Sequence, residues 1–205
     1  MSTPGRPARI APERESGERG MHTVLIRPAL AEDAETIAQL RIDAWRATYR
    51  GIMPDAYLDA MSLSDSAAFW DRILASGSPN ASVYVAVEDE RVVGFAAANV
   101  RDPPKFDLDA ELSAIYIAAE HKRRGIGRRL VAAVAAAQRA RGAHGFITWV
   151  IARNQPARAF YERLGGELLV EQPFQWDGLD LVEAGYAFRD LDVLAAMDAG
   201  NPALH

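Results

Sequence analysis

The chain has 205 residues, enough for one domain with tails, and its hydrophobic share of 49% and charged share of 25% are typical of a soluble globular protein. Cysteine is absent, which excludes disulfides, a thiolate nucleophile and thiolate metal ligands, and the four scattered histidines make a metal site unexpected. The net charge of −5 argues against a nucleic-acid binder. No apolar run is long enough to span a membrane, and no signal peptide is evident. We therefore expect a cytoplasmic protein with neither nucleic acid nor a membrane as partner.

The N-terminal twenty residues are rich in Pro, Gly, Arg and Glu, which predicts a disordered tail over 1–20. A strand is predicted directly after Met21, over His22–Arg27, and we hypothesise that translation starts at that methionine. The folded domain is expected over 21–190, followed by a short helix and a C-terminal tail over 191–205.

Helical spacing of apolar residues predicts a helix after Pro28 as far as Tyr49, ended by Gly51 and Pro54. A second helical stretch is predicted over 55–75, with an interruption near Ser62–Ser64, and a loop follows over 77–80. Alternating apolar residues then predict strands over 83–87, 91–100 and 111–118, the second of them ended by Asp102-Pro103-Pro104.

The second half of the chain continues with an Ala-rich helix predicted over 125–141 and an apolar strand over 146–151. A short helix is predicted over 154–164, with Asn154 as its N-cap. A last antiparallel pair is predicted over 168–170 and 181–189, with a tight turn at Asp177-Gly178. This order of elements predicts an α/β fold in which helices cover both faces of a mixed sheet.

The segment from Ile115 to Leu130 reads as a strand, a basic turn and two glycines that open a helix. A helix N-terminus offers free N–H groups and positive potential, which suits a phosphate. The Walker pattern is absent, and Leu130 occupies the third glycine position of a dinucleotide fingerprint. Taken alone, a Gly-x-Gly pair is more often an ordinary loop with a solvated basic face.

Two motifs together are similar to those of the GNAT superfamily, the Gcn5-related N-acetyltransferases. The first is Lys122-Arg123-Arg124-Gly125-Ile126-Gly127, which resembles the family's pyrophosphate loop, although Lys122 replaces its usual Gln or Arg. The second runs from Asn154 to Gly165 and resembles the family's Asn-x-x-Ala-x-x-Phe-Tyr-x-x-x-Gly segment. The resemblance spans about 24–189 and implies a mixed, mostly antiparallel central sheet flanked by helices on both faces.

The resemblance also implies acetyl-CoA as co-substrate, bound where two parallel strands splay apart. Backbone groups of one strand would pair with the pantetheine arm, and the turn before the helix would hold the pyrophosphate. The positions so implied are Ile115, Tyr116, Ile117, Lys122, Arg123, Arg124, Gly125, Ile126, Gly127, Arg128 and Asn154. The side chains of Arg123, Arg124 and Arg129 are alternatives for reaching the outer phosphate.

Tyr161 matches the family's general acid, and a protonated tyrosine can donate to the thiolate that thioester aminolysis expels. Glu111 is the leading candidate for the base that takes a proton from the amine, although a solvated residue at a strand edge explains it equally well. Asp43 is the second candidate, either as base or as anchor for the substrate ammonium. Because cysteine is absent, direct transfer in a ternary complex is favoured.

Aromatic residues of the first helix and the last hairpin are candidates for the walls of an acceptor pocket, although such residues are more often core. With Asp43, the candidate acceptor-binding residues are Trp45, Tyr49 and Trp176. The leading hypothesis is an N-acetyltransferase acting on the primary amine of a small molecule, either an amino-acid-like metabolite or an antibiotic. The alternatives are acetylation of a protein N-terminus or lysine, and a non-catalytic acyl-CoA-binding module. The oligomeric state is open, a homodimer included.

Overall fold

The computed structural model describes residues 23–198, so the predicted tail over 1–20 and the hypothesis on Met21 lie outside the described residues. The strands are β1 (Leu25–Pro28), β2 (Ala81–Glu88), β3 (Arg91–Lys105), β4 (Leu108–Ile117), β5 (Phe146–Ile151), β6 (Glu167–Trp176) and β7 (Leu179–Phe188). The α-helices are α1 (Ala34–Tyr49), α2 (Asp55–Asp59), α3 (Leu63–Ala75), α4 (Ile126–Arg139), α5 (Gln155–Arg163) and α6 (Leu191–Ala195). Short 3₁₀ turns are η1 (Ala31–Asp33), η2 (Ala119–His121) and η3 (Ala196–Asp198).

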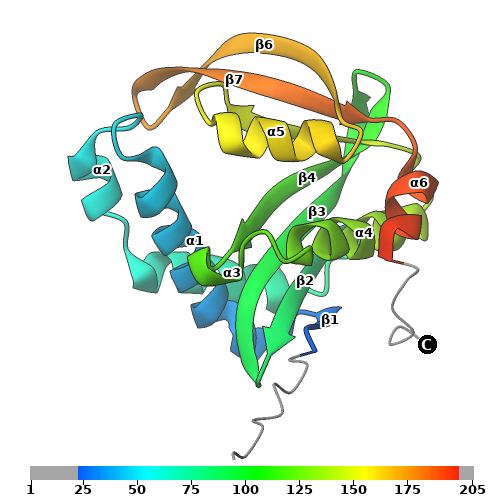
Figure 1. The fold of residues 1–205 in the computed structure, drawn as a ribbon, viewed down its shortest axis with the longest axis horizontal. Coiled ribbons are helices and arrows are strands. Elements are labelled where there is room, and N and C mark those ends of the chain that lie inside the picture. The colour runs from blue at the N-terminus through cyan, green and yellow to red at the C-terminus, as the bar shows by residue number, and fades with distance from the viewer. Residues whose placement is uncertain (1–22, 199–205) are drawn as a thin grey trace, which may run out of the picture.

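The strands form one twisted sheet in the order β1-β2-β3-β4-β5-β7-β6, with β1 and the β6–β7 pair at opposite ends (Figure 1). Neighbouring strands are antiparallel except β4 and β5, which are parallel. A parallel pair needs a crossover, and here α4 supplies it between the two strands. The predicted mixed, mostly antiparallel sheet is confirmed.

Helices cover both faces of this sheet, as predicted. On one face, α4, α5 and α6 bury apolar residues such as Leu130, Leu164 and Leu194 against the strands. On the other face, α1 and α3 bury Ile37 and Trp70 against β2 and β3. These two layers place the β4–β5 pair at the centre of the molecule, between α4 and α5 on one side and α1 on the other. No helix within residues 23–198 is both long and apolar enough to cross a lipid bilayer.

Strand β3 continues to Lys105, beyond the end predicted at Asp102-Pro103-Pro104. The prediction was wrong because a proline interrupts a strand only where its missing N–H is needed for the ladder. The β3–β4 ladder has no residue pairs between Val100 and Lys105, so these prolines remove no ladder hydrogen bond.

The predicted C-terminal helix is present as α6, but it does not lie outside the domain. Leu191 and Leu194 are almost fully buried, and α6 packs on α4. The compact part of the chain therefore extends past residue 190, because two leucines three positions apart place one face of this short helix in the core.

Candidate active site

Strands β4 and β5 separate halfway along their length. Their parallel register ends at Leu112 and Thr148, while β4 runs on to Ile117 and β5 to Ile151. The separation begins at a β-bulge, since Ala97 pairs with Ala114 and Ala98 pairs with Leu112, which leaves Ser113 as the extra residue. Over residues 113–117, β4 therefore has a ladder with β3 on one edge and none with β5 on the other.

The turn before α4 presents a helix N-terminus beside this separation. Gly125 is the N-cap with φ +81°, a conformation that suits glycine, and no side chain caps the helix. Within the described range, the backbone N–H groups of Ile126, Gly127 and Arg128 donate to no carbonyl group. A Cβ at Gly127 would lie 3.0 Å from Ile117 Cδ1 and 3.1 Å from the Phe160 ring, so the helix start packs closely against β4 and α5. Free N–H groups held in this way can bind an anionic phosphate.

The basic side chains of this turn have different surroundings. Arg124 donates to both carboxylate oxygens of Glu88 at the end of β2, and His121 lies 3.0 Å from the same carboxylate. The hydrogen bond from Arg124 holds the pKa of the Glu88 carboxyl below its ordinary value. Arg129 donates to the carbonyl oxygen of Val24. Arg124 therefore fastens the turn to β2, and Arg129 fastens the first turn of α4 to the residue before β1.

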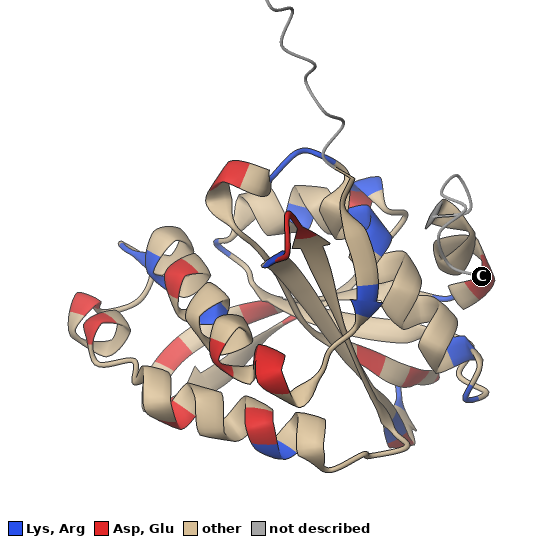
Figure 2. Cartoon of the chain, turned by 90° about the horizontal axis from the view of Figure 1, so that it is seen from below, with Lys and Arg blue, Asp and Glu red and all other residues tan. Residues whose placement is uncertain are grey.

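Three other cations of the turn are exposed, at Lys122, Arg123 and Arg128. Arg123 adopts φ +63°, a conformation that residues other than glycine rarely adopt and that occurs at functional turns. Figure 2 shows basic residues on the segment that precedes α4, whereas acidic residues lie along α1, α2 and α3.

Tyr161 of α5 lies in the core beside the splayed strands, with only 6% of its surface exposed. Burial raises the pKa of Tyr161 above its ordinary value, and a hydrogen bond with Thr148 of β5 opposes the rise only in part. Tyr49 and Tyr116 lie close enough to raise this pKa further. The Tyr161 phenol is therefore protonated at neutral pH, as a general acid must be before it donates.

Asn154 is the N-cap of α5, as predicted, since its side-chain oxygen accepts a hydrogen bond from the backbone N–H of Ala157 at 3.2 Å. Its Nδ2 donates to the hydroxyl of Tyr49 at 3.3 Å. Burial raises the pKa of Tyr49 to about 12. The residue thus links α5, on one face of the sheet, to α1, on the other.

Glu111 lies at the start of β4, on the face of the sheet that α1 covers, and its side chain is 19% exposed. Burial raises the pKa of its carboxyl, the charges of Arg101 and Lys105 lower it, and Glu183 of β7 raises it. Burial dominates, so the net shift is upward. Arg101 Nε lies 3.3 Å from Glu111 Oε2. A partly buried carboxylate with a raised pKa is a suitable general base.

Aromatic residues from distant segments close the space over this face. Trp45 donates from Nε1 to the hydroxyl of Tyr116 at 2.8 Å, and its ring lies 5.5 Å from that of Trp176. Trp176, at the end of β6, donates to the hydroxyl of Tyr57 at 2.6 Å. The tip of the last hairpin is therefore fastened to α1 and α2. The structure brings together Trp45, Tyr49 and Trp176, and their role as the wall of an acceptor pocket stays a prediction.

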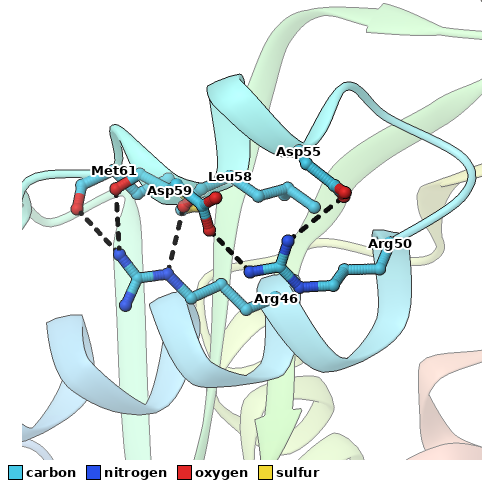
Figure 3. A network of polar contacts seen from close by, with 6 residues as sticks. All are labelled: Arg46, Arg50, Asp55, Leu58, Asp59 and Met61. Atoms are coloured by element: carbon cyan, nitrogen blue, oxygen red, sulfur yellow. Dashed lines mark hydrogen bonds and ion pairs between the residues drawn. The ribbon is translucent and has the colours of Figure 1, made fainter.

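Helix α2 is fixed to α1 by two arginines (Figure 3). Arg46 donates to three backbone carbonyl groups, those of Leu58, Asp59 and Met61. Arg50 forms ion pairs with the carboxylates of Asp55 and Asp59, at 3.1 and 2.5 Å. Since Tyr57 is on α2, the backbone contacts of Arg46 also position the partner of Trp176.

Asp43 is not brought to this group. It lies exposed on α1 and accepts a hydrogen bond from Gln39 at 2.9 Å. It is separated from Trp45 by about 200° around the helix, at 100° per residue, so it faces away from the aromatic wall. Sequence reasoning also missed Glu88, Arg101 and Tyr57, because each acts through a partner that is distant in the sequence.

The chain matches the model of the Acetyltransferase (GNAT) family over residues 37–166. It is 34% identical to the uncharacterized N-acetyltransferase YuaI of Bacillus subtilis over 176 residues, which cover 85% of this chain and 98% of that protein.

Solved structures share the fold. The PaiA N-acetyltransferase of Thermoplasma acidophilum, solved with coenzyme A, has a TM-score of 0.61 at 21% identity and covers 79% of this chain and 98% of its own. A ribosomal-protein-alanine N-acetyltransferase of Brucella melitensis has a TM-score of 0.62 at 23% identity, with 80% and 99% covered. The predicted resemblance is confirmed: the chain belongs to the acetyltransferase (GNAT) family and is an acetyl-CoA-dependent N-acetyltransferase.

Proposed function

We propose that this enzyme acetylates the primary amine of a small molecule by direct transfer in a ternary complex. The observation that carries the proposal is the closure of the acceptor side by the β6–β7 hairpin. Trp176 at its tip bonds to Tyr57 and packs on Trp45, so the hairpin lies against α1 and α2. A protein acceptor would need an open groove at this place, whereas a small amine needs an enclosed aromatic site.

The donor is assigned to the gap between β4 and β5. Backbone groups of Ile115, Tyr116 and Ile117 on the unpaired edge of β4 would pair with the pantetheine arm. The free N–H groups at the start of α4, with the exposed side chains of Lys122, Arg123 and Arg128, would hold the pyrophosphate. Arg124 is assigned a different part, because its guanidinium is bound to Glu88: it fixes the conformation of the turn.

The chemistry needs two proton transfers in opposite directions. Glu111 accepts the proton that the acceptor amine loses as its nitrogen attacks the thioester carbonyl. Tyr161 donates a proton to the sulfur as the carbon–sulfur bond breaks, since its raised pKa keeps the phenol protonated. Asn154 positions Tyr49 and the start of α5, and through α5 the general acid.

Thermal unfolding in the presence of acetyl-CoA, CoA, ATP and NADH tests the donor site first. A ligand at about 100 times its Kd stabilises the folded state by roughly 2.7 kcal/mol. Acetyl-CoA and CoA should raise the Tm, whereas ATP and NADH should not. Release of free thiol with a panel of small amines, compared with peptides of free N-terminus, then tests the acceptor class. Turnover with the peptides alone would contradict a small-molecule acceptor.

A further inference from the structure

A pocket of about 500 Å³ lies along the C-terminal part of β3, between Asn99 and Lys105. It occurs where the ladder between β3 and β4 is interrupted, between Val100 and Lys105. The proposed catalytic steps do not use it.

The pocket adjoins the proposed base through one shared residue. Arg101 lines the pocket, and its Nε lies 3.3 Å from Glu111 Oε2. Asn99, which also lines it, stands opposite Glu111 in the β3–β4 ladder, so the two side chains leave the sheet on the same face. An acceptor whose nitrogen lies at Glu111 would therefore have its neighbouring atoms close to the pocket.

Positive charge predominates in the pocket lining. Within residues 23–198, the two terminal nitrogens of Arg101 have no hydrogen-bond partner. The ammonium of Lys105 lies 4.4 Å from the centre of the Trp149 ring and 5.4 Å from that of Phe106, with no carboxylate of the described chain within ion-pair distance. The lining includes one carboxylate, that of the exposed Asp102.

Arg101 already forms one ion pair, through Nε with Glu111, and its terminal nitrogens and the Lys105 ammonium remain available for a further anion. A guanidinium whose outer nitrogens are unpaired, next to an ammonium held by aromatic rings, is suited to bind an oxyanion through charge-assisted hydrogen bonds.

We propose that this pocket binds an oxyanion of the acceptor, either a carboxylate or a phosphate, while the acceptor's amine lies at Glu111. The acceptor is then zwitterionic. An α-amino acid carries its amine and its carboxylate on one carbon, which matches the contact between the Glu111 carboxylate and the Arg101 guanidinium. The inference rests on the proposed function, since it names the class of amine that the same site takes.

The test compares acceptors that differ only in the oxyanion. Amino acids are paired with their decarboxylated amines, for example tyrosine with tyramine and histidine with histamine, and O-phosphoethanolamine is paired with ethanolamine. We expect kcat/KM to be roughly tenfold or more higher for the anionic member of the favoured pair. The amino-acid pairs and the phosphate pair distinguish the two sources of the oxyanion.

The variants Arg101→Gln and Lys105→Met should each reduce this ratio several-fold. Any effect of Arg101→Gln on the basicity of Glu111 cancels in the ratio of the two kcat/KM values, because both members of a pair use the same base. Arg72→Gln, which removes an exposed positive charge on α3, should leave the ratio unchanged.

Two results would overturn the proposal. Equal kcat/KM for both members of every pair would mean that the pocket takes no oxyanion. The second is a higher kcat/KM for the decarboxylated amine, with a larger difference in Lys105→Met. It would mean that Trp149 and Glu111 bind an alkylammonium at the place that the Lys105 ammonium now occupies. In either case turnover of some amines would still be measured, so the proposed function would stand. If no small amine were acetylated, the result would count against the proposed function.

Discussion

The donor side and the acceptor side of the site are built in different ways. The proposed donor side consists of continuous segments, the turn before α4 and the helix α5. It offers backbone N–H groups at the start of α4 and a close contact of Gly127 with β4 and α5. The acceptor side is assembled from side chains of α1, α2, β4 and the β6–β7 hairpin that meet only in the folded protein. The two sides join at the splayed strands, where Tyr161 and Tyr116 lie close together.

This difference predicts that the two sides of the proposed site respond separately to substitution. A backbone cradle tolerates many side chains as long as its glycines and its packing remain. An acceptor wall made from separate elements can be altered one residue at a time without touching that cradle. Variants on the donor side should therefore change the apparent affinity for acetyl-CoA, and variants on the acceptor side should change the KM for the amine.

Tyr161 should give the largest effect, because it is the proposed acid for the step that both sides share. We expect Tyr161→Phe to lower kcat by roughly 10²-fold or more, since general acid catalysis contributes about this much. The Kd for CoA, measured by thermal shift, should stay the same because the phenyl ring keeps its packing.

Tyr186→Phe is the matched control for this substitution. Tyr186 is also buried, but its hydroxyl is bonded to Arg158 and Glu162. Loss of that hydroxyl should lower thermal stability and leave kcat near that of the unmodified enzyme. Equal turnover by Tyr161→Phe and the unmodified enzyme would remove Tyr161 from the mechanism.

The pH dependence of kcat/KM should identify Glu111 as the base. A base acts when deprotonated, so the rate should rise with pH through the pKa of Glu111, which burial places above the ordinary value for a glutamate. Arg101→Gln removes a charge that lowers this pKa and should move the acid limb to higher pH. Glu183→Gln removes a charge that raises it and should move the limb to lower pH.

Glu111→Gln should abolish this acid limb and lower kcat by roughly 10- to 10²-fold. The pH profile is the decisive measurement, because a purely structural role for Glu111 would not shift the limb in opposite directions in the Arg101 and Glu183 variants. An acid limb that persists in Glu111→Gln would assign the base elsewhere.

Variants of Arg124 and Glu88 distinguish two roles for Arg124, direct binding of phosphate and support of the turn. If Arg124 acts by fastening the turn, Arg124→Gln and Glu88→Gln should both raise the KM for acetyl-CoA, by roughly three- to tenfold, with little change in kcat. If Arg124 instead binds phosphate directly, Glu88→Gln frees its guanidinium and should lower that KM. Initial rates over a range of acetyl-CoA concentration distinguish the two.

The sequence predicted the local structure of the proposed donor side and only part of the packing around the proposed acceptor site. The binding roles of these residues remain predictions. Gly125, Gly127 and Asn154 act within their own turn or helix end, so a short motif contains the whole signal. Pro103 and Pro104 can lie inside β3 because the β3–β4 ladder is interrupted there. The local sequence of β3 does not specify this interruption, because it depends on how β4 pairs with β3.

Long-range partners explain the remaining misses. Arg124 was one of three arginines considered for the outer phosphate, and the structure shows its guanidinium hydrogen-bonded to Glu88 at the end of another strand. Helical spacing put Trp45 and Tyr49 on one face of α1, and the same spacing places Asp43 on the opposite, exposed face. Periodicity could therefore have excluded Asp43, whereas nothing local could have named Glu88.

The smallest expected effect lies in the network that fixes α2, where two arginines one turn apart can be compared (Figure 3). Arg46 satisfies three backbone carbonyl groups at the end of α2, and we expect Arg46→Met to lower the free energy of unfolding by about 1–2 kcal/mol. Because α2 carries Tyr57, the partner of Trp176, the KM for the amine should rise about threefold with the KM for acetyl-CoA unchanged.

Arg50→Gln loses only exposed ion pairs, which solvent screens, so neither stability nor either KM should change measurably. Urea unfolding measures the stability of each variant, and initial rates with each substrate varied in turn measure the two KM values. A matching rise in the KM for acetyl-CoA in Arg46→Met would show that the two sides of the site are coupled.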